Sequence, residues 1–178
     1  MLTTKDKIKQ AVAGAIKATG QGLQGRTGIF STLSKDHGKV ASLMSELAET
    51  DNDEVHRREA LFETIRVELL AHAQAEDAVF YERCSSLHQL VDKVALARDE
   101  HGDIETLLAE LSHMHAGQQA WMDKFVSLKT RVSVHVAVEE KEVFPIAQEY
   151  LSGDEADALD AEYAQRRESA MKRLGDAA

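Results

Sequence analysis

Four stretches of this chain carry apolar residues at alternating spacings of three and four, the period of a helix with one hydrophobic face. The stretches cover residues 30–47, 61–79, 94–111 and 125–146. Each apolar face is interrupted only by histidine and glutamate. The pattern therefore predicts four long amphipathic helices around a shared core, with a few titratable side chains placed inside that core.

Short polar segments separate the four stretches. Residues 50–53 carry turn-forming and capping side chains, Ser85 and Ser86 lie between the second and third stretches, and Gly117 follows the third. Short connections between long helices favour antiparallel neighbours. A single proline and an aromatic content of 5% also favour a helical protein. We therefore predict an all-α fold, an up-down-up-down four-helix bundle with short extra N- and C-terminal helices.

The extra helices lie on either side of the bundle sequence. Residues 5–18 form a short amphipathic pattern, and the glycines between residues 20 and 28 indicate a flexible linker. A charged helical pattern begins near Gly153 and runs to about Lys172, and we expect it to pack outside the bundle. The predicted organisation is an N-terminal helix and linker over 1–26, a bundle over 27–150 and a C-terminal helix over 151–178.

The two halves of the bundle sequence resemble each other. Asp36-His37-Gly38 in the first half corresponds to Glu100-His101-Gly102, 64 residues later. Each of these segments is followed by a second histidine with a glutamate four residues further on, which gives the pairs His72 with Glu76 and His135 with Glu139. Histidine and glutamate at this spacing lie on the same helix face, one turn apart.

Antiparallel helices bring two residues to the same depth when the midpoint between them falls in the connecting loop. The midpoint of His72 and His101 falls beside Ser85 and Ser86, and that of His101 and His135 falls beside Gly117. The midpoint of His37 and His72 falls a few residues past the expected loop, so this pair fits less well. The register nevertheless predicts that most of these side chains meet at one level of the bundle.

Four imidazoles and two carboxylates at one level could hold two metal ions, with two histidines for each ion and both carboxylates available as bridges. This mixture of nitrogen and oxygen ligands suits iron well, and manganese or zinc less distinctively. A single histidine on an apolar face is more often a hydrogen-bonded core residue than a ligand. Six such residues in a duplicated arrangement are hard to explain in that way, so we interpret them as a metal site.

The chain resembles the hemerythrin-like (HHE) family over residues 29–147. The matching segments are Leu33-Ser34-Lys35-Asp36-His37, His72-Ala73-Gln74-Ala75-Glu76-Asp77, Asp99-Glu100-His101 and the stretch from His135 to Phe144-Pro145. The resemblance implies two non-haem iron ions in the bundle, joined by carboxylates and by an oxo or hydroxo bridge. It also implies that Glu76 and Glu139 are the bridging carboxylates, that His37 and His72 bind one iron, and that His101 and His135 bind the other.

One position departs from the pattern of the oxygen-carrying members of that family. Those proteins have an additional histidine one turn after the ligand on the third helix, and Glu105 stands there in this chain. Glu105 could be a terminal or a third bridging ligand, or a polar residue at the edge of the apolar face. A carboxylate ligand would favour the ferric state and would disfavour simple reversible oxygen carriage.

Composition restricts the classes of partner. The formal net charge of −10 disfavours nucleic acid and anionic membranes as partners. No long apolar run indicates a signal peptide or a membrane span, and the single cysteine fits a reducing compartment, so we expect a cytoplasmic protein. The sequence identifies no protein partner.

The leading functional hypothesis is a di-iron protein that binds dioxygen or a related small ligand, such as nitric oxide or peroxide, as a sensor, scavenger or store. One alternative is a redox enzyme that turns over peroxide or nitric oxide. Another is an interaction module, in which iron folds the bundle and the flanking helices contact a partner.

Overall fold

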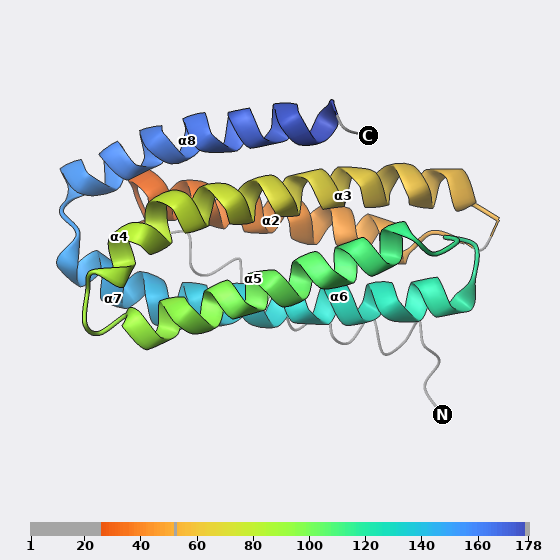
Figure 1. The fold of residues 1–178 in the computed structure, drawn as a ribbon, viewed down its shortest axis with the longest axis horizontal. Helices are drawn as coiled ribbons and strands as arrows, with labels where there is room; N and C mark the ends of the chain where they lie inside the picture. The colour runs from red at the N-terminus through yellow and green to blue at the C-terminus, as the bar shows by residue number, and fades with distance from the viewer. Residues whose placement is uncertain (1–25, 52, 177–178) are drawn as a thin grey trace.

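The computed structural model describes residues 26–51 and 53–176, which contain helices and no strands. Figure 1 shows these helices along one long axis. In chain order they are α2 (Gly28–Ala48), α3 (Val55–Glu76), the π-helix η1 (Asp77–Tyr81), α4 (Glu82–Ser85), α5 (Val91–Ser112), α6 (Gln119–Val138), the π-helix η2 (Glu139–Val143), α7 (Phe144–Tyr150) and α8 (Gly153–Gly175). The helix predicted over residues 5–18, and most of the glycine linker after it, lie outside the described residues.

The predicted up-down-up-down bundle is confirmed. Its four rods are α2, α3 continued through η1 and α4, α5, and α6 continued through η2 and α7 (Figure 1). The chain reverses direction near residues 49–54, 86–90 and 113–118, where the short polar segments predicted it. No helix of residues 26–51 or 53–176 has a long enough apolar stretch to cross a membrane.

Two apolar clusters fill the bundle on either side of the level at which His37, His72, His101 and His135 lie, called the histidine level below. One lies at the α4 and α7 end, where the rings of Phe30, Phe80 and Phe144 meet edge to face at 5.5–5.7 Å between centroids. The other lies at the end with the α2–α3 and α5–α6 connections, where Trp121 packs against Phe62 and Phe125. Full burial of each such ring stabilises the fold by roughly 1.5–3 kcal/mol, so well-packed core holds the histidine level from both sides.

A buried arginine joins the connections at one end of the bundle. Arg58, only 1% exposed, donates hydrogen bonds to the carbonyl oxygens of Thr50, Asp51 and Ala116 and to the Thr50 hydroxyl. A buried charge is tolerated only where such partners surround it. Arg58 therefore ties the α2–α3 connection to the α5–α6 connection.

Each His-x-x-x-Glu segment leads directly into a π-helix. The first, η1, follows Glu76, and the second, η2, begins at Glu139. A π turn carries more residues than an α turn and so shifts which residues face inward. This shift allows consecutive residues to be buried, as Val79, Phe80 and Tyr81 are. The helical period did not predict these two turns.

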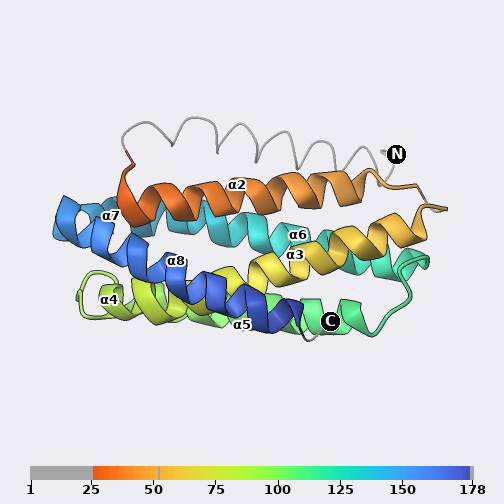
Figure 2. The same ribbon diagram turned by 90° about the horizontal axis from the view of Figure 1, so that it is seen from above.

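The C-terminal helix α8 is a full-length helix of 23 residues, longer than we expected from the sequence. It begins with a capping box formed by Ser152 and Glu155, and it lies outside the bundle along α2 and α3 (Figures 1 and 2). At the start of α2, Gly28 has a φ of +53°, and a Cβ there would come within 2.7 Å of the backbone of Ala156. Glycine is thus required where α8 crosses the start of α2.

Candidate metal centre

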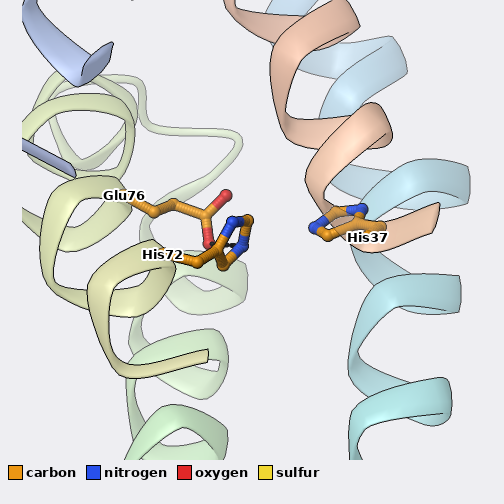
Figure 3. A group of neighbouring side chains, drawn as sticks. All are labelled: His37, His72 and Glu76. Atoms are coloured by element: carbon orange, nitrogen blue, oxygen red, sulfur yellow. Dashed lines mark ion pairs between the residues drawn. The ribbon is translucent and has the colours of Figure 1, made fainter. Parts of the chain in front are cut away.

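The structure brings the six predicted residues together halfway along the bundle. Each of the four histidines and two glutamates is at most 6% exposed. Two groups of three have ligand atoms within 4.8 Å of one another, namely His37, His72 and Glu76, and then Glu76, His101 and His135. Figure 3 shows the first group, with His72 and Glu76 on α3 facing His37 on α2. Glu76 belongs to both groups and so lies between two potential metal positions.

The Nε2 atoms of the imidazoles face the centre of this cluster. Oε2 of Glu76 lies 3.3 Å from Nε2 of His72 and 3.4 Å from Nε2 of His101. Nε2 of His101 lies 3.2 Å from Nε2 of His135. His37 and His72, whose register fitted less well in the sequence, have ring centroids only 5.0 Å apart. All four histidines therefore lie at one level.

The sixth residue, Glu139, contacts His37 directly and is linked to His101 through Tyr81. Its Oε2 lies 3.2 Å from Nε2 of His37, and its Oε1 accepts a hydrogen bond of 3.0 Å from the Tyr81 hydroxyl. The Tyr81 ring also stacks on His101, with 5.5 Å between centroids. Glu139 is not part of either compact group of three, but it lies directly beside them.

The Nδ1 atoms point outward, and each has a polar partner. These partners are Glu140 for His37 at 2.9 Å, Asp77 for His101 at 3.2 Å, Glu100 for His135 at 3.0 Å and the Tyr163 hydroxyl for His72 at 2.9 Å. Such a partner holds the proton on Nδ1, orients the ring and leaves Nε2 free to bind a metal. The imidazoles are thus arranged as metal ligands usually are.

Several polar atoms in the cluster lack a hydrogen bond to any described residue. They are Nε2 of His37, Nε2 of His72, both carboxylate oxygens of Glu76 and Oε2 of Glu139. Burying a polar group without a hydrogen bond is costly, so folded proteins rarely leave several such atoms together. All of these atoms face the centre. Bound cations would satisfy them, and the residues present therefore fit a metal centre.

The two glutamates differ in their protonation in the metal-free protein. Burial would raise the pKa of Glu76, but the charge of His72 and the close approach of the His101 and His72 imidazoles hold it well below its ordinary range. Burial and the negative charge of Glu76 raise the pKa of Glu139 to about 7. Glu76 is thus the carboxylate that remains charged, as a ligand shared by two cations needs to be.

The imidazoles also differ. Burial would lower the pKa of His37, but the close carboxylate of Glu139 and the hydrogen bond to Glu140 raise it to about 10. His72 and His101 behave similarly, with each pKa raised to about 9 by acidic neighbours that outweigh burial. Burial and the charge of His101 lower the pKa of His135 to about 3. In the metal-free protein, protons on three imidazoles therefore supply the positive charge that the buried carboxylates need.

A mostly apolar pocket adjoins the cluster on the side of the α2–α3 connection. Aliphatic side chains, Val40, Leu69, Ile104 and Val132 among them, line it together with the four histidines. Its free volume is about 20 Å³, which is room for a ligand about the size of a water molecule. The pocket therefore leaves space for a very small molecule beside the four histidines.

Glu105 is not brought into the centre. Its side chain is exposed, and Ile104 and Leu108 occupy the inward face of α5 next to His101. Of the alternatives that the sequence left open, its position fits the polar residue at the edge of the apolar face.

Sequence reasoning missed the outward partners of the histidines, although the repeat contained most of them. Asp36 and Glu100 each precede a histidine, and Asp77 and Glu140 each follow a glutamate, in both halves. The acidic residues next to the ligands were therefore a usable signal. Tyr163 had no such signal, because it belongs to α8, outside the repeat.

Comparisons with known proteins identify a family and a shared fold. The model of the hemerythrin HHE cation-binding domain matches residues 28–147. The crystal structure of an HHE cation-binding domain-containing protein from Mycobacterium kansasii is similar, with a TM-score of 0.72 and 24% identity over 83% of this chain and 90% of that one, which shows a shared fold. A Nostoc protein named DNA nickase is 27% identical over 174 residues, which are 95% of this chain. The chain spans about half (49%) of the length of that relative.

Proposed function

Since the chain belongs to the hemerythrin HHE cation-binding family, we propose that its six converging side chains hold two iron ions and that the centre binds dioxygen or a related small ligand. Its role would be that of a sensor, a scavenger or a store. The observation that carries the proposal is the pair of three-residue groups that share Glu76. One ion would be held by His37, His72 and Glu76, and the other by Glu76, His101 and His135.

The donor set supports iron as the metal. Imidazole nitrogens and carboxylate oxygens together suit iron, whereas a thiolate-rich set would favour zinc or copper. Glu139 would serve as a second bridge, held in place by the hydroxyl of Tyr81. When bound, two iron ions would supply redox-active cations beside the apolar pocket. The aliphatic lining of that pocket limits the entry of water and favours a small, weakly polar ligand.

The burial of the centre favours a small ligand over a polymer. Because the six residues are at most 6% exposed, a phosphate group of a nucleic acid cannot reach their ligand atoms in this conformation. The net charge of −10 also opposes binding to a polyanion. A DNA substrate therefore has no support in the charge of this chain or in the burial of its centre.

Turnover of peroxide is a second candidate, favoured by a second pocket. This pocket reaches His135 and Glu139 from the side of α5 and η2, and its lining combines charged residues (Lys93, Glu100 and Glu142) with aliphatic ones (Leu96, Ala97, Val138 and Val143). The charged groups would accommodate a polar ligand such as peroxide beside the centre, whereas the first pocket suits dioxygen or nitric oxide.

Metal analysis and rapid mixing test the proposal. We expect about two irons per chain after expression with sufficient iron, and the near-ultraviolet charge-transfer absorption of a bridged ferric pair. One zinc, or no metal, would contradict the di-iron proposal. Stopped-flow spectra of the reduced protein with dioxygen, nitric oxide and peroxide would distinguish a stable adduct from turnover. Glu105→Ala is the matched control, because it removes an exposed carboxylate on α5 and should change neither result.

A further inference from the structure

The two halves of the centre are related by the sequence repeat, and one residue breaks that relation. In the second half, Nδ1 of His135 pairs directly with Glu100 at 3.0 Å. The equivalent pair in the first half is His72 with Asp36, but their closest atoms are 3.7 Å apart, too far for a hydrogen bond. The hydroxyl of Tyr163 bridges them.

The Tyr163 hydroxyl makes two hydrogen bonds with defined directions. It donates to Oδ2 of Asp36 at 2.7 Å and lies 2.9 Å from Nδ1 of His72. Because its only proton is given to the carboxylate, the hydroxyl oxygen accepts the proton of Nδ1. Nε2 of His72 faces Glu76 and is therefore the nitrogen from which a metal would displace a proton.

Tyr163 belongs to a helix that is firmly positioned but lies outside the part of the chain matched by the family model, residues 28–147. Its side chain is 0% exposed. One turn further along α8, Arg167 forms ion pairs with Asp36 and with the buried Glu68 of α3. The close approach of Ala156 to Gly28 fixes the other end of the helix. The contacts of α8 thus include the outward side of one metal group.

We propose that Tyr163 is a positioning residue for His72, and that through it the docking of α8 and metal binding by His37, His72 and Glu76 stabilise each other. The inference rests on the proposed metal binding. Linkage requires the effect to be reciprocal: a docked α8 raises the affinity of this group, and a bound ion strengthens the docking of α8. Within residues 26–51 and 53–176, neither His101 nor His135 has a hydrogen bond to a side chain of α8, so the two metal positions differ.

The test compares Tyr163→Phe with Glu162→Ala in the full chain. Tyr163→Phe removes only the bridging hydroxyl, whereas Glu162→Ala changes the exposed neighbouring residue of the same helix, which pairs with Arg166 of α8. Metal-free protein is titrated anaerobically with Fe(II). For Tyr163→Phe we expect one of two binding steps to weaken by about 10–100-fold, the usual loss when the partner of a ligating histidine is removed. The other step should stay unchanged, as should both steps in Glu162→Ala.

Hydrogen exchange supplies a readout independent of affinity. Exchange of the α8 amides should slow when wild-type protein binds iron, and this slowing should be reduced in Tyr163→Phe. If Tyr163→Phe does not fold, Asp36→Asn can replace it. Asp36→Asn weakens the acceptor of the Tyr163 hydroxyl and should therefore weaken the same binding step.

The outcomes separate this inference from the proposed function. Two unchanged binding steps in Tyr163→Phe, an equal loss in both steps, or the same selective loss in Glu162→Ala would overturn the role of Tyr163 and leave the di-iron proposal intact. Wild-type protein that binds no iron would overturn both.

Discussion

Removing the metal should lower the melting temperature of this protein substantially. Without metal, four side chains in the middle of the bundle keep buried atoms that have no hydrogen bond to a described residue: His37, His72, Glu76 and Glu139. These side chains cannot turn to solvent, because apolar clusters pack the bundle on both sides of them. The metal-free fold therefore carries a cost that the metal-bound fold does not.

The size of the effect follows from the number of these side chains. Each unpaired buried polar group costs about 1–3 kcal/mol. Contacts of 3.2–3.4 Å between imidazoles and carboxylates offset part of that cost, so we take about 1 kcal/mol for each side chain, or about 4 kcal/mol in all. For a chain of this length, 1 kcal/mol corresponds to roughly 2–4 °C. We therefore expect the metal-bound form to melt about 8–16 °C higher than the metal-free form.

Differential scanning calorimetry of chelated and iron-reconstituted protein measures this difference, with metal content determined on the same samples. Glu76→Gln is the control, because it removes the ligand that both groups share and its two melting curves should nearly coincide. Far-ultraviolet circular dichroism should be similar for both wild-type forms well below the melting transition, since the apolar clusters remain. Equal melting temperatures for wild-type samples that differ by two irons would refute the reasoning.

Three further predictions concern stoichiometry, pH and the scaffold. Glu76→Gln should lose both irons, His72→Ala should lose mainly one, and Glu105→Ala should lose none; equal iron content in all three variants would contradict the assignment of Glu76 as the shared ligand. Three imidazoles have a pKa raised to about 9 or 10, above the ordinary 6.5, so they carry protons at pH 7 that a metal must displace. Metal affinity should therefore rise as the pH increases from 7 towards 9, with proton release measurable by calorimetry in buffers of different ionisation enthalpy. Arg58→Met should destabilise the fold by about 2–4 kcal/mol, because it leaves buried carbonyl oxygens unpaired, and it should leave the number of bound irons unchanged when the folded variant is analysed.

The sequence alone determined the bundle and the inward-facing residues. Helical periodicity depends on neighbours along the chain, so it shows which side chains share a face, and the repeat showed which of them are polar. Short loops then restricted the helices to antiparallel packing. Periodicity and repeat together were enough to select His37, His72, Glu76, His101, His135 and Glu139, and the fold brings these six side chains together.

The periodicity was not precise enough where a small rotation about the helix axis decides whether a side chain faces the core or the solvent. Glu105 follows His101 by four residues and so lies about 40° further round the helix. Ile104 and Leu108 lie on the other side of His101 and turn inward, which leaves Glu105 exposed. The π-helices after Glu76 and at Glu139 are a similar case, because the inserted residue is favoured by packing in three dimensions.

Only the tertiary structure decided the role of the C-terminal helix. Its polar sequence predicts a helix on the surface, but the pattern of α8 does not show which surface it covers or which side chain reaches inward. Tyr163 lies 91 residues from His72 in the chain, and no local rule connects them. The contact depends on the packing of α8 across α2 and α3, which also depends on Gly28 and Arg167. Contacts between residues so far apart are set by the packing of whole helices, so the hydrogen bond between Tyr163 and His72 could be found only in the tertiary structure.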